Sequence, residues 1–275
     1  MNSFLSFAAD RGLIIEHLSM GRWVRTRTKD HPKKRNGAYL FQGDFGVVQN
    51  WAQMDRAETW LKDRESKPDP DLLRRMAEAS ARQDRKRLED AKQAAQTAQA
   101  MLKRANTYTH PYLTAKGFPE AKGCVLDDAL VIAMKDLRGA IVGAQTIKMV
   151  DGEWQKKMLF GTRAKGAVHP LGNERKLILC EGYATGLSIQ AALNTFPSYT
   201  SVLVCFSAGN LVTVAAQVQN ASVIADNDAS QAGQKAAEAS GLPWAMPDIV
   251  GEDANDVYVK DGIVGVKRLL AKIRR

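Results

Sequence analysis

The sequence predicts an α/β protein whose second half contains a mostly parallel β-sheet flanked by helices. Short, almost continuously apolar segments alternate with helical stretches after residue 176, as is typical of strands covered on both faces. Residues 182–225, a run of 44 positions, carry no charged side chain, yet Pro197 and several amides interrupt the run, so it is not a membrane span. Acidic residues follow three of the predicted strands.

The net charge of +9 is unevenly distributed along the chain. Residues 177–258 carry −7, and the remainder carries +16. This pattern is typical of a protein that holds a polyanion on its surface and divalent cations at its centre, although solvated charged faces would also produce it. The three cysteines are scattered and form no C-x-x-C pair, which argues against a zinc ribbon or a disulfide framework. We therefore expect a reducing compartment, the cytoplasm.

Residues 1–65 are predicted to form a small basic unit. Ser3 and Gly12 are suited to begin and end a short helix, and alternation in the following segment predicts a β-hairpin or meander. Basic and aromatic side chains are interleaved there: Arg22, Trp23, Arg25, Arg27, Lys33, Lys34, Arg35, Tyr39, Phe41 and Trp51. Such a mixture is suited to binding single-stranded nucleic acid, through phosphate contacts and base stacking. The aromatic residues would equally serve as the core of a small sheet, and both interpretations stay open.

Residues 66–107 are predicted to form a long, exposed connecting helix. Pro68 and Pro70 precede strong helix formers, and the segment Thr109-His110-Pro111 follows them. Residues 108–172 then form a predicted α+β subdomain with strands near 129–136, 140–150 and 153–160, followed by a basic loop. The last predicted domain, residues 173–275, contains the parallel sheet.

Three acidic segments are predicted to converge at one edge of this sheet. Glu181 follows the strand 176–180, Asp226 and Asp228 end the strand 222–226, and the segment GEDANDVY contributes further acids. Alternation along a strand would turn Asp226 and Asp228 to the same side. Ligands of open α/β sheets bind at the carboxyl ends of the strands, and an all-oxygen site is what Mg²⁺ or Mn²⁺ prefers. Taken alone, a strand-end D-x-D could simply cap the next helix.

The ordered set of motifs is more specific than any one of them. CEGYATGLSIQAA, IADNDASQAGQKAA and GEDANDVY resemble the Toprim domain of bacterial-type primases, a domain shared with topoisomerases and some nucleases. HPYLTAKG, GAIVGAQTI and KKMLFGTRAKGAVHPLG resemble the segment that precedes Toprim in plasmid and phage primases. RWVRTRTKDHPKKRNGAYLFQGDFGVVQNWA is similar to primases of conjugative plasmids and mobile elements.

This resemblance implies a DNA primase that makes short RNA primers on single-stranded DNA by metal-dependent nucleotidyl transfer, for plasmid or phage replication. It implies Glu181 as general acid or base and possible metal ligand, and Asp226 and Asp228 as catalytic metal ligands. Asp253 and Asp256 would complete the site for Mg²⁺ or Mn²⁺. Contacts to nucleotide phosphates or template would come from four bases: Lys156, Lys157, Arg163 and Lys165. A solvated basic edge is the alternative interpretation of those four.

The sequence departs from replicative primases in lacking a cysteine-rich zinc module and a G-x-x-x-x-G-K-[ST] motif. The expected partners are therefore single-stranded DNA, ribonucleoside triphosphates and a separate replicative helicase, with no membrane. Two other functions stay open. The same acids would suit a Toprim nuclease that cleaves DNA or RNA, and the fold would also suit a non-catalytic single-strand-binding accessory protein.

Overall fold

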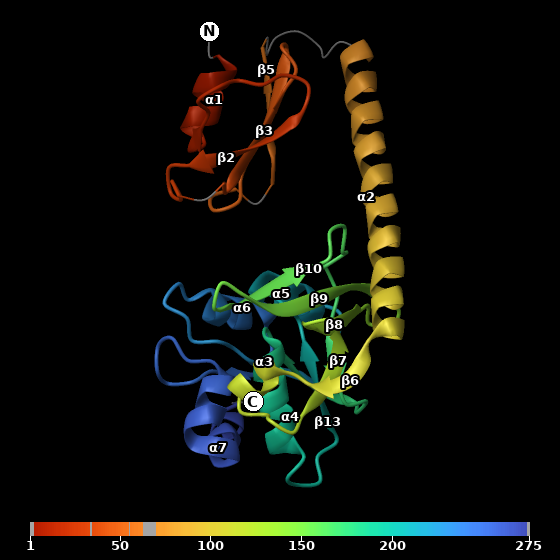
Figure 1. Ribbon diagram of the computed structural model, residues 1–275. Coiled ribbons are helices and arrows are strands. Elements are labelled where there is room, and N and C mark those ends of the chain that lie inside the picture. Colours follow the sequence, from red (N-terminus) through yellow and green to blue (C-terminus); the bar gives the residue numbers. More distant parts are fainter. Residues whose placement is uncertain (1–2, 34, 55, 63–69, 274–275) are drawn as a thin grey trace. The chain divides into compact units, whose positions relative to one another are not determined.

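The computed structural model describes residues 3–33, 35–54, 56–62 and 70–273 (Figure 1). The chain divides into two compact units, residues 1–79 and 80–275. Pro68, Lys34 and the predicted start of the connecting segment at 66–69 lie outside the described residues. Within the described part of the chain, no helix has the length and apolar character needed to cross a membrane.

The described residues of the first unit that precede Pro70 form one short helix and a five-stranded antiparallel meander, as predicted. Ser3 caps α1 (Phe4–Asp10) by accepting a hydrogen bond from the Ser6 amide at 3.2 Å. The strands follow in sequence order: β1 (Leu13–Ile14), β2 (Trp23–Thr28), β3 (Gly37–Phe41), β4 (Phe45–Asn50) and β5 (Glu58–Leu61). Helix α1 covers one face of this sheet, where Phe4, Tyr39 and Trp60 form the centre of a small core.

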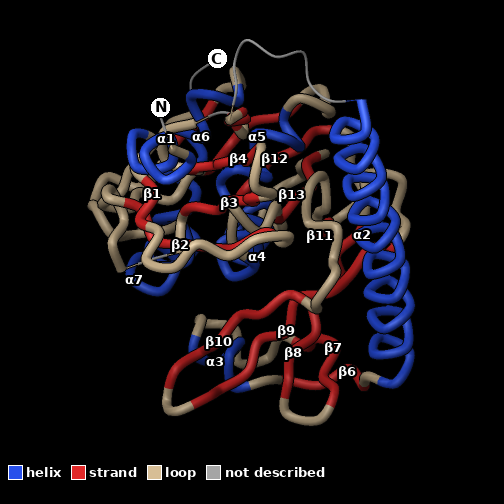
Figure 2. Tube along the Cα trace, turned by 90° about the horizontal axis from the view of Figure 1, so that it is seen from above, coloured by secondary structure: helices blue, strands red, loops and turns tan. Residues whose placement is uncertain are grey.

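The second unit begins within α2 (Pro70–Arg104) and continues into an antiparallel sheet of order β10-β9-β8-β7-β6 (Figure 2). Its elements are β6 (Asn106–Thr109), α3 (Pro111–Ala115), β7 (Lys122–Leu126), β8 (Ala129–Lys135), β9 (Ile141–Val150) and β10 (Glu153–Met158). The sequence predicted an exposed helix here, and for the end of α2 this prediction is wrong. Ala94 and Ala98 are buried, and Ala98 packs with Val131 and Ala144 on one face of the sheet, because its small side chain lets the helix approach closely.

The last part of the chain forms a second sheet of order β11-β13-β12-β14-β15. Its elements are β11 (His169–Leu171), β12 (Lys176–Cys180), α4 (Tyr183–Leu193), β13 (Thr200–Val204), α5 (Ala208–Ala215), β14 (Ala221–Ile224), α6 (Ala232–Ser240), β15 (Trp244–Ala245) and α7 (Ala254–Ala271). Strands β13, β12, β14 and β15 are parallel, and only β11 runs antiparallel. The predicted α/β class with a mostly parallel, helix-flanked sheet is confirmed.

Alternating side chains of this parallel sheet enter two different cores. Ile178, Val202 and Ile224 pack toward α4 and α7, whereas Leu179, Leu203 and Val223 pack toward α5 and α6. Both faces are therefore buried, which is why the strands read as continuous apolar runs. The α4 side of the core also includes Ile132 and Ile147 of the antiparallel sheet, so the two sheets share one hydrophobic core. The predicted limits 108–172 and 173–275 remain a proposal about subdomains within this unit.

Candidate active site

The carboxyl edge of the parallel sheet gathers acidic side chains from three loops. Glu181 directly follows β12, Asp226 follows β14 by two residues, and Asp253 is the residue before α7. The backbone holds these loops together. The Phe206 amide donates to the Glu181 carbonyl at 2.8 Å, which extends the β12–β13 pairing beyond the strands. This edge is where ligands of open α/β sheets bind.

Asp226 is the most perturbed of these carboxylates. Its Oδ1 atom is buried and has no hydrogen-bond partner. Burial, followed by the charges of Asp253 and Glu181, raises the pKa of Asp226 from 3.8 to about 7, while Lys156 lowers it and Asp228 raises it further. A buried carboxyl with an unpaired oxygen among other acids is a site that a cation or a proton would stabilise.

Asp228 has a different environment, although it lies only two residues away. Its carboxylate accepts hydrogen bonds from the amides of Ser230 at 2.9 Å and Gly233 at 3.0 Å, and also from the Ser230 hydroxyl. These bonds lower the pKa of Asp228 to about 2. Strand β14 ends at Ile224, so strand alternation does not set the direction of either aspartate. Asp228 therefore holds the start of α6, as in the capping alternative.

Glu181 is partly buried, and its pKa is also raised. Burial is the main cause, and the charge of Asp228 adds to it. The charge of Lys156 and the backbone amide of Ala208, in the first turn of α5, lower the pKa in opposition. Glu181 and Asp226 thus share the positive charge of one lysine, which is too little to relieve both carboxyl groups.

Asp253 and Asp256 form the capping box of α7. Asp253 accepts from the amides of Asn255 at 2.7 Å and Asp256 at 3.0 Å, and Asp256 accepts from the Asp253 amide at 2.9 Å. The charge of Asp253 nevertheless raises the pKa of Asp226, so the two carboxyl groups lie near each other. Asp256 is exposed on the first turn of α7.

Lys156 is the predicted base that the structure brings to these acids. In β10 it pairs across the sheet with Ile147, which is fully buried in the core shared with the parallel sheet. Its charge reaches both Glu181 and Asp226. The Nζ atom also lies 5.8 Å from the centroid of the Tyr112 ring, which helps to fix the side chain.

The other three predicted bases are more dispersed. Successive residues of a strand point to opposite faces, so Lys157, which pairs with Thr146, points away from the face that carries Lys156. Arg163 forms an ion pair of 3.5 Å with Asp136. Lys165 is exposed in the loop between β10 and β11.

Three asparagines that the sequence analysis did not single out organise this edge. The Asn227 side chain donates to the Pro247 carbonyl at 2.9 Å, and its backbone amide donates to the Glu252 carbonyl at 3.0 Å, joining two acidic loops. Asn255 is fully buried and donates to the Lys116 carbonyl at 2.9 Å. The only sequence signal for Asn227 and Asn255 is their position beside acidic residues.

The third asparagine, Asn210, is buried in α5. Its Oδ1 atom accepts from the Gly166 amide at 2.7 Å, and its Nδ2 donates to the carbonyls of Ala167 at 2.7 Å and Cys205 at 2.8 Å. Asn210 thus ties the basic loop that carries Lys165 to the end of β13. Nothing in the sequence pattern distinguishes it from the other polar residues of the uncharged run.

The acidic residues of this edge fit a divalent cation that keeps part of its hydration shell. Among the described residues, no three His, Cys, Asp or Glu side chains are arranged to hold a metal ion by themselves. Mg²⁺ does not require such a cage, because it retains waters and typically takes one or two carboxylates together with substrate phosphates. The unpaired Oδ1 of Asp226 and the neighbouring carboxylate of Glu181 fit that requirement.

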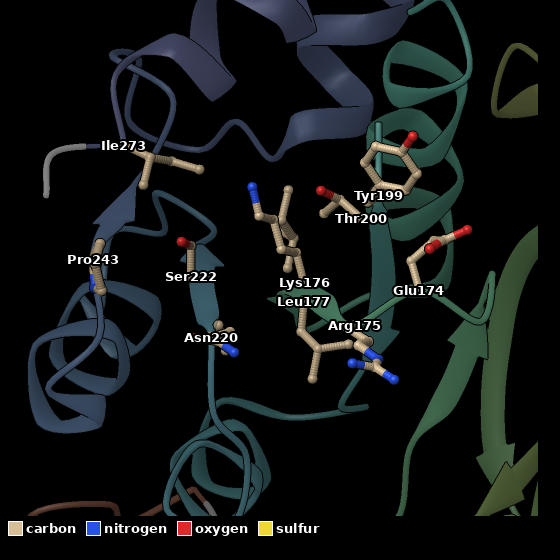
Figure 3. Close-up of a pocket in the computed structure, with 12 residues that line it drawn as sticks. Glu174, Arg175, Lys176, Leu177, Tyr199, Thr200, Asn220, Ser222, Pro243 and Ile273 are labelled. Carbon is tan, nitrogen blue, oxygen red and sulfur yellow. The ribbon is translucent and has the colours of Figure 1, made fainter. Parts of the chain in front are cut away.

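A cavity of about 850 Å³ lies at the opposite edge of the same sheet. Residues at the amino ends of the strands line it, including Lys176, Tyr199, Thr200, Asn220 and Pro243. Figure 3 shows these side chains around the strand starts, with none of the acidic site residues among them. The cavity is therefore separate from the candidate active site.

Comparison with known proteins finds one family model that matches part of the chain. Residues 176–263, which contain Glu181, both strand-end aspartates and the α7 capping box, match the family model of the Toprim domain. This match concerns the Toprim domain alone and does not distinguish primases, or plasmid and phage proteins, from other proteins that contain the domain. No curated protein gave a match to the chain.

Solved structures with some likeness to the chain include a bacteriophage T7 lagging-strand DNA polymerase complex interacting with primase domains of two gp4 subunits. That match has 16% identity, covers 61% of this chain and 93% of the other, and has a TM-score of 0.42. The RNA polymerase domain of Mycobacterium tuberculosis primase DnaG matches with 15% identity over 60% of this chain and 63% of the other, at a TM-score of 0.37. A DNA primase domain from Pseudomonas aeruginosa matches with 16% identity over 64% and 58%, at a TM-score of 0.38. The chain thus spans less than two thirds of the latter two, and likeness at this level does not assign an activity.

Proposed function

We propose that this protein is a DNA primase, a nucleotidyltransferase that joins ribonucleotides on a single-stranded DNA template. The observation that carries the proposal is the buried, unpaired Oδ1 of Asp226, which lies among acids at the carboxyl edge of a sheet that matches the Toprim family. The proposed substrates are ribonucleoside triphosphates and single-stranded DNA. The resemblance of the sequence to plasmid and phage primases supports a role in such replication, with a separate helicase as a further partner.

Glu181, Asp226 and Asp228 would hold Mg²⁺ or Mn²⁺, and Asp253 and Asp256 would complete the set of metal ligands. A bound divalent cation would lower the pKa of the attacking 3′-hydroxyl and neutralise the triphosphate. Hydrogen bonds from the Ser230 hydroxyl and from the amides at the start of α6 lower the pKa of Asp228 to about 2, so this carboxylate is ionised at neutral pH. Asp226 is the group that gains most from a cation, because its Oδ1 atom is buried without a hydrogen-bond partner.

The chain supplies the proton acceptor and the phosphate contacts. In the proposed reaction the 3′-hydroxyl oxygen attacks the α-phosphorus, the bond to the pyrophosphate leaving group breaks, and the hydroxyl proton moves to Glu181. Glu181 suits this role because its raised pKa brings it closer to neutral pH than that of an ordinary glutamate. Lys156 faces the same space and would contact the nucleotide phosphates. Lys157, Arg163 and Lys165 are proposed to contact template or phosphates further out.

The test is an incorporation assay with radiolabelled ribonucleoside triphosphates on single-stranded DNA. A primase produces short, template-dependent RNA in the presence of Mg²⁺ or Mn²⁺. A Toprim nuclease would instead degrade labelled DNA or RNA without any triphosphate. An accessory protein would do neither, while still binding the template.

A further inference from the structure

The meander of the first unit has one face that α1 does not cover, which we call the open face. Strand alternation places Trp23, Arg25 and Arg27 of β2 on it, whereas Val24 lies on the side of the α1 core. The neighbouring strands contribute Leu40, Val47 and Gln49, which are partly exposed. They also contribute Ala38 and Phe45, which are buried. Among the described residues of strands β2 to β5, no acidic residue lies on this face, because Glu58 pairs with Val48 on the side of the α1 core.

The structure thereby separates the aromatic residues that the sequence analysis treated together. Tyr39 is buried beside Phe4 in the small core, and Phe41 packs against the same phenyl ring. Trp23 and Trp51, in contrast, are 42% and 48% exposed. An exposed indole ring keeps a large apolar surface in water, which is unfavourable. Such a surface is typical of a site that binds another molecule. The core interpretation is therefore confirmed for Tyr39 and Phe41, and the binding interpretation stays a prediction for Trp23 and Trp51.

Arg25 and Trp51 form a preassembled pair on this face. The Arg25 Cζ atom lies 4.1 Å from the centroid of the Trp51 ring. Its guanidinium also donates two hydrogen bonds to the Arg35 carbonyl, from Nε at 3.1 Å and from Nη2 at 2.6 Å. The guanidinium plane is thus fixed over the indole, and little rotational freedom remains to be lost on binding.

We propose that the open face binds single-stranded nucleic acid. Exposed indoles and a fixed guanidinium plane are surfaces on which bases stack, and unstacked bases are available only in single strands. The surrounding basic side chains are complementary to a polyanion. Arg22 and Arg35 are exposed, and Arg27 pairs with Glu16 beside the sheet. A sheet face of this kind offers no helix for the major groove of a duplex. This binding face belongs to the first unit and the acidic edge to the second, so binding to the face does not require catalysis at the acidic edge.

The experiment measures fluorescence anisotropy of labelled oligothymidylate titrated with the full chain in EDTA. Trp23→Ala and Trp51→Ala should each weaken binding by about 5- to 150-fold, because each removes a stacking surface. Trp51→Phe, which keeps an aromatic face, should recover most of the affinity. Arg25→Gln should weaken binding and reduce the slope of log affinity against log salt by about 0.7, as expected for one lost phosphate contact.

Matched controls come from the second unit. Tyr199→Ala removes an aromatic side chain that is 74% exposed, and Arg82→Gln removes an exposed charge from α2. Both should bind as the wild type does, apart from the general effect of one charge. A duplex of the same length should compete poorly.

Wild-type affinity in both tryptophan variants, or equal affinity for duplex and single strand, would overturn the proposal. The result is separable from that of the proposed function by including Asp226→Asn, which should bind oligothymidylate normally but make no primers. If the tryptophan variants bind normally while the wild type makes primers, the binding proposal for the open face is wrong and the proposed function stands. If the tryptophan variants lose binding but no protein makes primers, the proposed function fails instead.

Discussion

Gly233 lies directly against the backbone of Asp226. A Cβ atom on Gly233 would stand 2.2 Å from the Asp226 carbonyl oxygen, far inside contact distance. The amide of the same glycine donates to Oδ2 of Asp228 at 3.0 Å. The first turn of α6 is therefore held against both aspartates, and any side chain at position 233 would push the helix away from them.

Gly233→Ala should consequently lower the melting temperature and the activity together. Alanine normally stabilises a helix by about 1 kcal/mol relative to glycine, so a loss would show that the contact with Asp226 dominates. Gly209→Ala in the first turn of α5 is the matched control, since a Cβ there meets nothing within 4 Å. Thermal unfolding followed by circular dichroism makes the comparison, and equal melting temperatures for the two variants would refute the packing argument.

Asp226→Asn should stabilise the metal-free protein in a pH-dependent way. The folded pKa of Asp226 is raised from 3.8 to about 7, so the folded wild type holds a proton that the unfolded chain has released. The wild type therefore loses stability as the pH rises through this window, by at most about 4 kcal/mol, and the variant does not.

In EDTA, Asp226→Asn should melt above the wild type at about pH 8 and lose that advantage near about pH 4. Asp248→Asn, which changes an exposed aspartate, provides the control. An advantage that is the same at both pH values would mean that the Asp226 carboxyl is not strained by its neighbours.

Lys156→Gln and Lys157→Gln form an adjacent pair that separates the two faces of β10. Lys156→Gln removes the charge that lowers the pKa of both Glu181 and Asp226, so it should raise the KM for nucleotide and shift the pH profile of activity upward. Lys157→Gln removes an equal charge from the opposite face and should change the KM much less. Steady-state kinetics across pH would show this, and equal effects of the two substitutions would place both side chains at the nucleotide.

Asn210→Ala should destabilise the protein and weaken activity through the loop that carries Lys165. The substitution leaves the Gly166 amide and two carbonyls without partners, at a cost of about 1–3 kcal/mol for each buried group that water cannot reach. Thr213→Ala, one turn later in α5, removes only a hydrogen bond of 3.3 Å to the Gly209 carbonyl. Chemical denaturation compares the two variants. Similar losses in the free energy of unfolding would mean that the hydrogen bonds of Asn210 do not stabilise this loop.

The sheet and its acidic edge were predictable because their signals are local. Apolar runs that end in Glu181 and Asp226 carry both the strand and its polar end in a few residues. The uncharged run between them predicted burial on both faces, and the parallel order of β12, β13 and β14 follows from the helices that connect them.

The remaining features depend on contacts between distant segments. Whether Asp228 faces a cation or the start of α6 depends on where Gly233 lies, and strand alternation stops before either aspartate. The burial of Ala98 depends on the sheet that folds against it. Likewise, only the register of β10 with β9 separates Lys156 from Lys157.

The most direct test of the central claim is extension of an RNA primer annealed to single-stranded DNA, because it isolates nucleotidyl transfer from initiation. Wild-type protein with Mg²⁺ or Mn²⁺ should add labelled ribonucleotides that match the template. Asp226→Asn and Glu181→Gln should each abolish addition, whereas the exposed control Glu238→Gln should retain it. Extension by Asp226→Asn and Glu181→Gln at the wild-type rate, or no extension by any protein including the wild type, would contradict the claim that this acidic edge joins nucleotides.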